Sequence, residues 1–294
     1  MSRRKSRPLR SLGKLALYVT VALIAFWTLG PIYVTVVSSL SYDSDLTSVP
    51  PPWIPLRPTL EHYEQVFSPL FNPGGLAATT ADRVLPALRN SSIIAVSIVA
   101  LNIVIGGLAG FAVTWLRFRF KSLFVGFILM TIYVPAFPLI YPFFVTFQTL
   151  HLLDTHLAVI LAQNAFILPF SVWLLSGYFE AVPADIVDAA AVDGCTVFQT
   201  FYKIVLRLSL PGIFAAAVFS FMLSWNDFLF PLLLTNSLAA MGITPVIAGF
   251  LQDFRIQYGL ISASTLLAAV VPVLLVLIAQ SFLVKGLMRG AVKG

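Results

Sequence analysis

Six long apolar segments constrain this chain more than any other feature of its sequence. A bilayer core about 30 Å thick is crossed by roughly 20 apolar residues in an α-helix. The segments that meet this length are Leu15–Val37, Ser91–Leu116, Leu123–Phe147, Leu157–Leu175, Leu210–Leu234 and Leu260–Val284. The sequence therefore predicts an all-α integral membrane protein with six transmembrane helices.

Composition agrees with lipid as the main solvent of this chain. Of its 294 residues, 59% are hydrophobic and only 10% are charged, whereas soluble domains carry about 25% charged residues. No small-residue cleavage pattern directly follows the first apolar segment, so we expect that segment to be retained as a helix. The single cysteine, Cys195, cannot form an internal disulfide.

The basic residues gather on one side of the predicted membrane. Arg57, Arg83, Arg89 and Arg255 lie on the opposite side. The other 14 of the 18 Lys and Arg residues are Arg3, Arg4, Lys5, Arg7, Arg10, Lys14, Arg117, Arg119, Lys121, Lys203, Arg207, Lys285, Arg289 and Lys293. By the positive-inside rule, both termini are cytoplasmic. The net charge of +6 is then a topology signal and argues against binding to nucleic acid.

This topology divides the chain into three parts. Residues 1–14 form a basic cytoplasmic N-terminus, residues 15–284 a transmembrane domain, and residues 285–294 a basic cytoplasmic tail that we expect to be flexible. The longest inner connection is 176–209, and the second outer segment is 236–257.

Motifs for catalysis and for cofactors are absent from the sequence. It contains no Gly-x-x-x-x-Gly-Lys-Ser/Thr loop for ATP and no visible Ser-His-Asp or paired-carboxylate site. His151 and His156 flank Asp154 and suggest a metal site, but their spacing places them on different faces of a helix. We expect Asp154-Thr155 to cap the fourth span instead. A non-catalytic protein without a cofactor or metal is predicted.

Asp227 is the only Asp, Glu, Lys, Arg or His within the six segments. It follows Trp225 and Asn226 near the outer end of the fifth segment. Two interpretations stay open. Asp227 is either a functional group of a transport pathway or an interfacial residue facing outer water, with Trp225 as an aromatic anchor.

Three prolines interrupt the third segment, and we interpret them as a broken helix that lines a pathway rather than as simple kinked packing. Mid-span amides mostly join helices, so only one or two should face this pathway. Gly106 and Gly110 form a Gly-x-x-x-Gly pattern, which is a weak packing signal. The pathway residues considered are Asn102, Pro138, Tyr141, Asn164, Asn226 and Asp227.

The inner connection contains a short predicted helix between Pro183 and Gly194. Proline suits the first position of a helix, and glycine suits the position after its last turn. Asp185 and Asp188 place negative charge in the first turns, where the helix dipole favours it. The following alanines have small side chains, so another protein surface could approach the helix closely.

The same stretch resembles the cytoplasmic motif of permeases from binding-protein-dependent ABC importers. That motif is Glu-Ala-Ala, three residues, Gly, nine residues, Ile-x-Leu-Pro. Here Asp188 replaces the glutamate and Arg207 stands in place of the proline. The other matching positions are Ala189, Ala190, Gly194, Ile204 and Leu206.

Three further patterns resemble the smaller six-span permease of the maltose-type subgroup. They are Leu88-Arg89-Asn90-Ser91, Trp225-Asn226-Asp227-Phe228 and the tail with Lys285, Gly286, Gly290 and Lys293. The resemblance implies a type I ABC importer permease fold in a bacterial plasma membrane. It also implies a second permease subunit, two cytoplasmic ATP-binding subunits and an extracytoplasmic solute-binding protein for a sugar or sugar-like solute.

The resemblance further implies how the parts act. The short helix, with Asp185, would be the coupling helix seated on an ATPase, the tail would reach the ATPase interface, and the outer loop 236–257 would touch the binding protein. The alternative is a stand-alone secondary transporter or channel, which should show paired charges or inverted repeats at mid-membrane. Neither is visible in the sequence.

Overall fold

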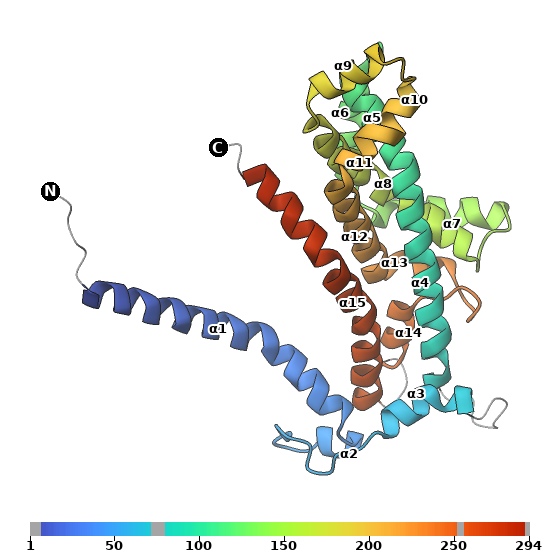
Figure 1. Cartoon of the computed structure of the whole chain (residues 1–294). Coiled ribbons are helices and arrows are strands. Elements are labelled where there is room, and N and C mark those ends of the chain that lie inside the picture. Colours follow the sequence, from blue (N-terminus) through green and yellow to red (C-terminus); the bar gives the residue numbers. More distant parts are fainter. Residues whose placement is uncertain (1–6, 72–79, 252–255, 292–294) are drawn as a thin grey trace. The chain divides into compact units, whose positions relative to one another are not determined.

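The structure is a computed structural model, and it describes residues 7–71, 80–251 and 256–291, with side chains for 13–68, 81–251 and 256–280. The chain divides into two compact units. The first comprises residues up to Ala81 together with Phe250–Leu267, and the second comprises Asp82–Gly249 with Ala268–Gly294. Every regular element in the described ranges is helical (Figure 1).

The first unit contains α1 (Arg7–Ser39), α2 (Asp43–Leu46), α3 (Glu61–Phe71) and the start of α15 (Tyr258–Ala291). The side chain of Asp43 accepts a hydrogen bond from the backbone N–H of Gly259 at 2.8 Å. Buried His62 lies 3.0 Å from the carbonyl oxygen of Ser41. These contacts fix the ends of α1 and α15 to the short helices between them.

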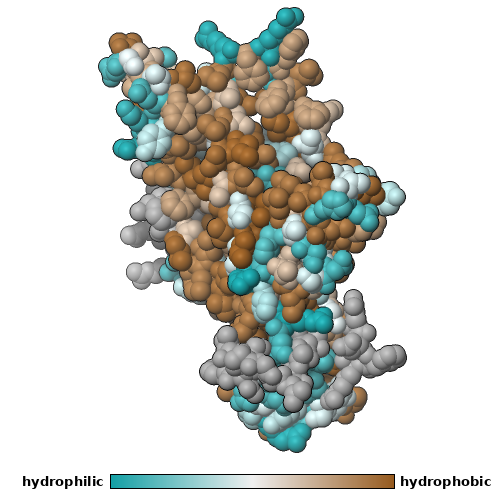
Figure 2. Space-filling model, turned by 90° about the vertical axis from the view of Figure 1, so that its right-hand side faces the viewer, coloured by the Kyte–Doolittle hydropathy of each residue, from teal (hydrophilic) through white to brown (hydrophobic). Residues whose placement is uncertain are grey.

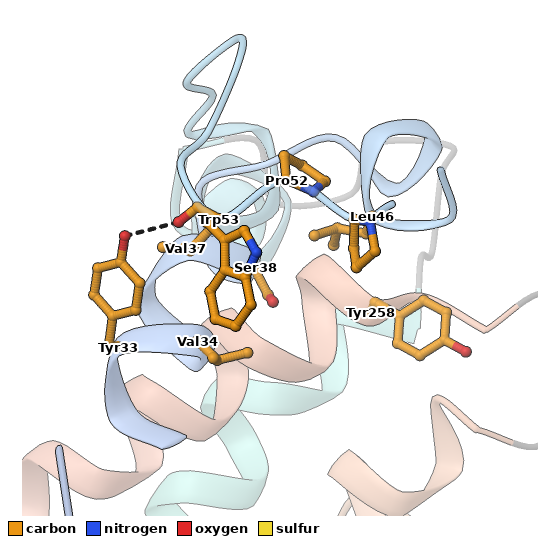
Figure 3. A pocket seen from close by; sticks show the side chains of 9 residues that line it. Tyr33, Val34, Val37, Ser38, Leu46, Pro52, Trp53 and Tyr258 are labelled. Carbon is orange, nitrogen blue, oxygen red and sulfur yellow. Dashed lines mark hydrogen bonds between the residues drawn. The ribbon is translucent and has the colours of Figure 1, made fainter. Parts of the chain in front are cut away.

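A pocket of about 230 Å³ lies within this first unit. The hydroxyl of Tyr33 donates to the carbonyl oxygen of Trp53 at 2.7 Å and closes one side of it (Figure 3). Aromatic rings with one polar end suit the boundary between lipid and water. The lining residues are Tyr33, Val34, Val37, Ser38, Leu46, Pro51, Pro52, Trp53 and Tyr258.

The second unit is a helical bundle built around α8 (His156–Glu180). The helices packed on it are α4 (Val84–Leu101), the π-helical turn η2 (Asn102–Gly106), α5 (Gly107–Trp115), α6 (Lys121–Ile132), α12 (Leu210–Asn226) and α13 (Leu229–Leu234). Its remaining elements are η1 (Thr80–Arg83, which leads into it), η3 (Phe137–Leu139), α7 (Ile140–Thr149), α9 (Ala184–Val192), α10 (Val197–Thr200), η4 (Phe201–Val205), α11 (Leu206–Leu208), α14 (Ile243–Gly249) and the part of α15 from Ala268 onward.

Two apolar clusters form the core of this bundle, one at each half of α8. The first gathers residues such as Ile98, Val159 and Leu234. The second gathers Phe179, Phe201 and Val205 beneath the predicted coupling helix. Figure 2 shows hydrophobic side chains over much of the visible face, with hydrophilic ones at its upper end, where Figure 1 places α9, and in further patches below.

Among the described residues, four of the six predicted spans are single helices, and the other two fall on bent helix pairs that each qualify as one span when taken together. Four helices are long and apolar enough to cross a membrane by themselves: Gly13–Ser39, Ala81–Trp115, His156–Glu180 and Tyr258–Gln280. The third span bends by 92° between Ile132 and Phe137. At the fifth, the bent pair is Val197–Leu208 with Leu210–Asn226, and its 80° bend comes just before the predicted span begins at Leu210.

The break in the third span follows from its prolines, as predicted, since Pro135 lies in the interruption and Pro138 in the short 3₁₀ turn after it. The predicted fifth span, Leu210–Leu234, is interrupted in the structure, because α12 ends at Asn226 and Asp227 is extended. In the predicted tail, helix α15 continues through Ala291.

Candidate functional site

The inner connection folds into a short helix, α9, with a fixed C-terminal cap. Gly194 has φ of +80°, a left-handed conformation that disfavours any residue with a Cβ. The N–H of Cys195 donates to the carbonyl of Ala190 at 2.9 Å, and the N–H of Gly194 donates to that of Ala191 at 3.1 Å. This pair of bonds is a Schellman motif, and it confirms the predicted role of glycine at this end.

The other end of α9 differs slightly from the prediction. Pro183 has ψ of 132° and precedes the helix as its N-cap, so α9 contains nine residues from Ala184. Proline fixes φ there and removes an N–H that would have no partner in the first turn. Asp185 lies in that first turn, where its charge stabilises the helix.

One face of α9 is exposed, and it carries most of the predicted coupling residues. Asp185, Asp188, Ala189 and Gly194 are all exposed. Ala190 is different, because it is only 4% exposed. The expectation that Ala190 meets a partner surface was wrong, because Ala190 and Val187, three residues before it, lie on the one side of α9 that packs on the chain itself.

The segment after α9 anchors it to the bundle. Thr196 and Gln199 form a reciprocal capping box that starts α10. Phe201 packs against Phe111 with ring centroids 5.0 Å apart, and Val205 is completely buried. Leu206 is half-buried against the same cluster, and Ile204 beside it is half-buried. These two motif residues therefore belong to the base of the loop rather than to its exposed face.

At the far end of α12, Asp227 is the centre of a polar network. Its carboxylate accepts a hydrogen bond from Nε2 of Gln163 at 2.7 Å and caps α13 through the N–H groups of Leu229 and Phe230, each at 3.3 Å. The hydroxyl of Ser224 donates to the other end of Gln163 at 2.7 Å. Both sequence-based interpretations of Asp227 omitted this network, because Gln163 is separated from it by 64 residues.

The other pathway residues fall into two groups. Asn102 donates to Oδ1 of Asn164 at 2.8 Å, and both side chains are buried between helices. Pro138, Tyr141 and Asn226 are exposed in the single chain, with Tyr141 at 75%. The structure thus brings Asn102 and Asn164 together and leaves the other three open to a neighbour.

The expected capping of α8 is half confirmed. Thr155 is its N-cap and accepts from the N–H of Ala158 at 3.2 Å. Asp154 instead accepts from the backbone of residues 236 and 237. In the predicted tail, Lys285, Gly286 and Gly290 lie on α15 beyond the residues with described side chains, and Lys293 lies outside the described residues.

Comparison with known proteins gives a family match over most of the chain. Binding-protein-dependent transport system inner membrane components match residues 102–289. A sulfoquinovosyl glycerol transport system permease protein of Agrobacterium fabrum is 32% identical over 98% of this chain and 94% of its own length. A trehalose/maltose transport system permease protein of Thermococcus litoralis is 31% identical over 96% of this chain and 98% of its own.

A solved structure shares the fold at lower sequence identity. It is a bacterial ABC transporter involved in the import of the acidic polysaccharide alginate, with a TM-score of 0.74. The two chains are 19% identical, and the likeness covers 95% of this chain and 99% of the other. The kinked six-span arrangement is therefore the fold of ABC importer permeases.

Proposed function

The chain belongs to the family of binding-protein-dependent transport system inner membrane components, and from this premise we propose that it imports a sugar or sugar-like solute. It is a non-catalytic permease subunit of a bacterial plasma membrane, and separate ATP-binding subunits hydrolyse the ATP. Similar permeases named for sulfoquinovosyl glycerol, trehalose and maltose transport support a carbohydrate as the solute. The chain forms half of the pathway, and a second permease subunit forms the rest.

The exposed face of α9 is the observation that carries the proposed mechanism. A helix with both ends fixed moves as one body, and Asp185, Asp188 and Ala189 face away from the bundle. We propose that this face lies in a cleft of one ATP-binding subunit. Closure of the two ATP-binding subunits then displaces α9 and biases the packing of the two permeases between inward and outward access.

The pathway itself is proposed from the side chains that the single chain leaves open. Pro138, Tyr141 and Asn226 face the second permease and the solute, with Asp227 at their outer limit. Asn102 and Asn164 hold α8 against η2. Aromatic and amide groups suit a sugar, which offers hydroxyls and apolar ring faces. The residues Lys285, Gly286, Gly290 and Lys293 are proposed to reach the ATPase interface.

A pair of cysteine variants tests whether the exposed face of α9 binds in a cleft of an ATP-binding subunit. In a Cys195→Ser background, Ala189→Cys places a thiol on the exposed face and Ala190→Cys places one in the buried face. With a short bifunctional cross-linker and the purified complex in lipid, we expect Ala189→Cys to link to an ATP-binding subunit and Ala190→Cys to remain unlinked. Equal linkage of both, or linkage of neither in a fully assembled complex, contradicts the proposal.

A further inference from the structure

Residues 236–244, here called the outer platform, comprise most of the connection from α13 to α14 and the first two residues of α14, all in the second unit. Four consecutive residues, 236–239, are exposed. The residues that flank them, Thr235 and Ala240, are each only 1% exposed. The platform is therefore a short exposed tip on a buried base.

Asn90 in the first turns of α4 holds the base of the platform. Its Nδ2 donates to the carbonyl oxygens of Leu238 at 2.9 Å and Met241 at 3.1 Å. Its Oδ1 lies 3.0 Å from Nε2 of His156, the first residue of α8. The side chain of Asn90 is fully buried. One amide thus joins α4, α8 and the platform.

Two more side chains fix the platform from different parts of the chain. The hydroxyl oxygen of Ser91 accepts from the N–H of Ile243 at 2.9 Å. Oδ1 of Asp154 accepts from the N–H groups of Asn236 and Ser237, both at 2.9 Å. Burial acts to raise the pKa of Asp154, but the hydrogen bonds from Ser237 and Asn236 outweigh it and hold that pKa below its ordinary value.

These contacts define the backbone of the platform without any partner present. A buried donor or acceptor that loses its partner is costly, so the paired arrangement is strongly favoured. A segment that is already ordered loses less conformational entropy when another protein binds it. We propose that Asn90, Ser91 and Asp154 are positioning residues that preform the outer platform as a contact surface for the solute-binding protein.

This inference rests on the proposed function and adds a specific connection to it. The side chains that hold the platform lie in the first half of α4 and in the turn just before α8. Helix α8 runs for 25 residues, about 37 Å, and the chain enters α9 four residues after it ends. Contact of the binding protein with the platform therefore bears on the helix that leads into the coupling helix.

Neighbouring serines provide a matched test. Ser91→Ala removes the acceptor for Ile243, whereas Ser92→Ala removes a hydroxyl that bonds only within α4, to the carbonyl of Leu88 at 2.8 Å. Asn90→Asp keeps the size of the side chain and removes both donors to the platform. Each variant is assembled with its ATP-binding and permease partners in lipid nanodiscs.

Two measurements are made on each complex. One is amide hydrogen exchange of residues 236–244, and the other is the concentration of the cognate binding protein, purified with its native solute, that half-stimulates ATP hydrolysis. For Ser91→Ala we expect faster exchange and a rise of about fivefold in that concentration. Asn90→Asp should have at least as large an effect. Ser92→Ala should leave both the exchange and the half-stimulating concentration unchanged. Basal hydrolysis and the composition of the complex should be the same in all three variants.

The outcomes separate this inference from the proposed function. Faster exchange with an unchanged half-stimulating concentration overturns the inference, and so does an equal effect of Ser92→Ala. Unchanged exchange in both Ser91→Ala and Asn90→Asp overturns it as well. If the binding protein does not stimulate ATP hydrolysis by the wild-type complex at all, the proposed function is wrong, and so is this inference, which rests on it.

Discussion

The coupling helix and the outer platform are both short exposed segments, but they are held in opposite ways. Helix α9 is capped by Pro183 and Gly194, which lie at its own two ends. The outer platform is held by Asn90 and Asp154, about 150 and 80 residues away in the sequence. Because its caps are local, α9 keeps its conformation and can move as a unit. Contacts from residues distant in the sequence hold the platform on the bundle.

This contrast bears on what each segment does in transport. A coupling element must be displaced by an ATPase without losing its own shape, and caps that belong to the helix travel with it. A surface that receives the binding protein must stay attached to the bundle, and side chains of α4 and of the turn before α8 hold the outer platform there. The two arrangements predict different responses to mutation.

The largest effect is expected at the outer end, for Asp227→Ala. This change leaves buried Gln163 without its acceptor and removes the cap of α13, at a cost of about 2–3 kcal/mol for lost charge-assisted bonds. Solute uptake should fall more than tenfold and the melting temperature of the complex should drop. Asp227→Asn keeps the shape and should fall between Ala and wild type. If Asp227→Ala keeps wild-type uptake and a wild-type melting temperature, the network stabilises neither the pathway nor the fold.

At the coupling helix, the expected effect of Gly194→Val is smaller and lies in coupling rather than in folding. A Cβ on Gly194 would meet nothing within 4 Å, so the cost comes from the left-handed backbone alone, about 1–2 kcal/mol. We expect normal membrane insertion with ATP hydrolysis and transport uncoupled.

Gly194→Asn is the matched control for this change, because asparagine tolerates the left-handed conformation. It should retain most of the coupling. Hydrolysis stimulated by the binding protein and uptake are measured in the same proteoliposomes. If Val and Asn behave alike, the conformation of Gly194 is not what fixes α9.

The smallest effect is expected for Asp188→Glu on the exposed face of α9. The carboxylate remains, α9 gains a better helix former, and the neighbouring backbone is unaffected. Uptake should stay within about twofold of wild type, as for a surface substitution of low cost. A loss of uptake larger than tenfold would mean that the cleft of the ATPase does not accommodate the longer side chain of glutamate.

The cap at Gly194 was predicted from the sequence, whereas the packing contact of Gly110 was treated only as a weak signal. Gly110 approaches α8 so closely that a Cβ there would lie 3.2 Å from the backbone nitrogen of Ser176. A Gly-x-x-x-Gly pattern is frequent in membrane helices, so its presence alone did not establish this contact. Ala190 shows the reverse case. Its place in a surface motif suggested exposure, and packing against the bundle buried it.

The sequence by itself determined the apolar spans, the break in the third span and the caps of α9. Each of these depends on residues close together in the chain: apolar length, prolines within a helix, and a glycine after one. The tertiary structure alone decided which polar groups meet, such as Gln163 with Asp227 and Asn90 with residues 238 and 241. A buried polar group must find a partner, but any of many distant groups can satisfy it, and only the packing of the helices selects one.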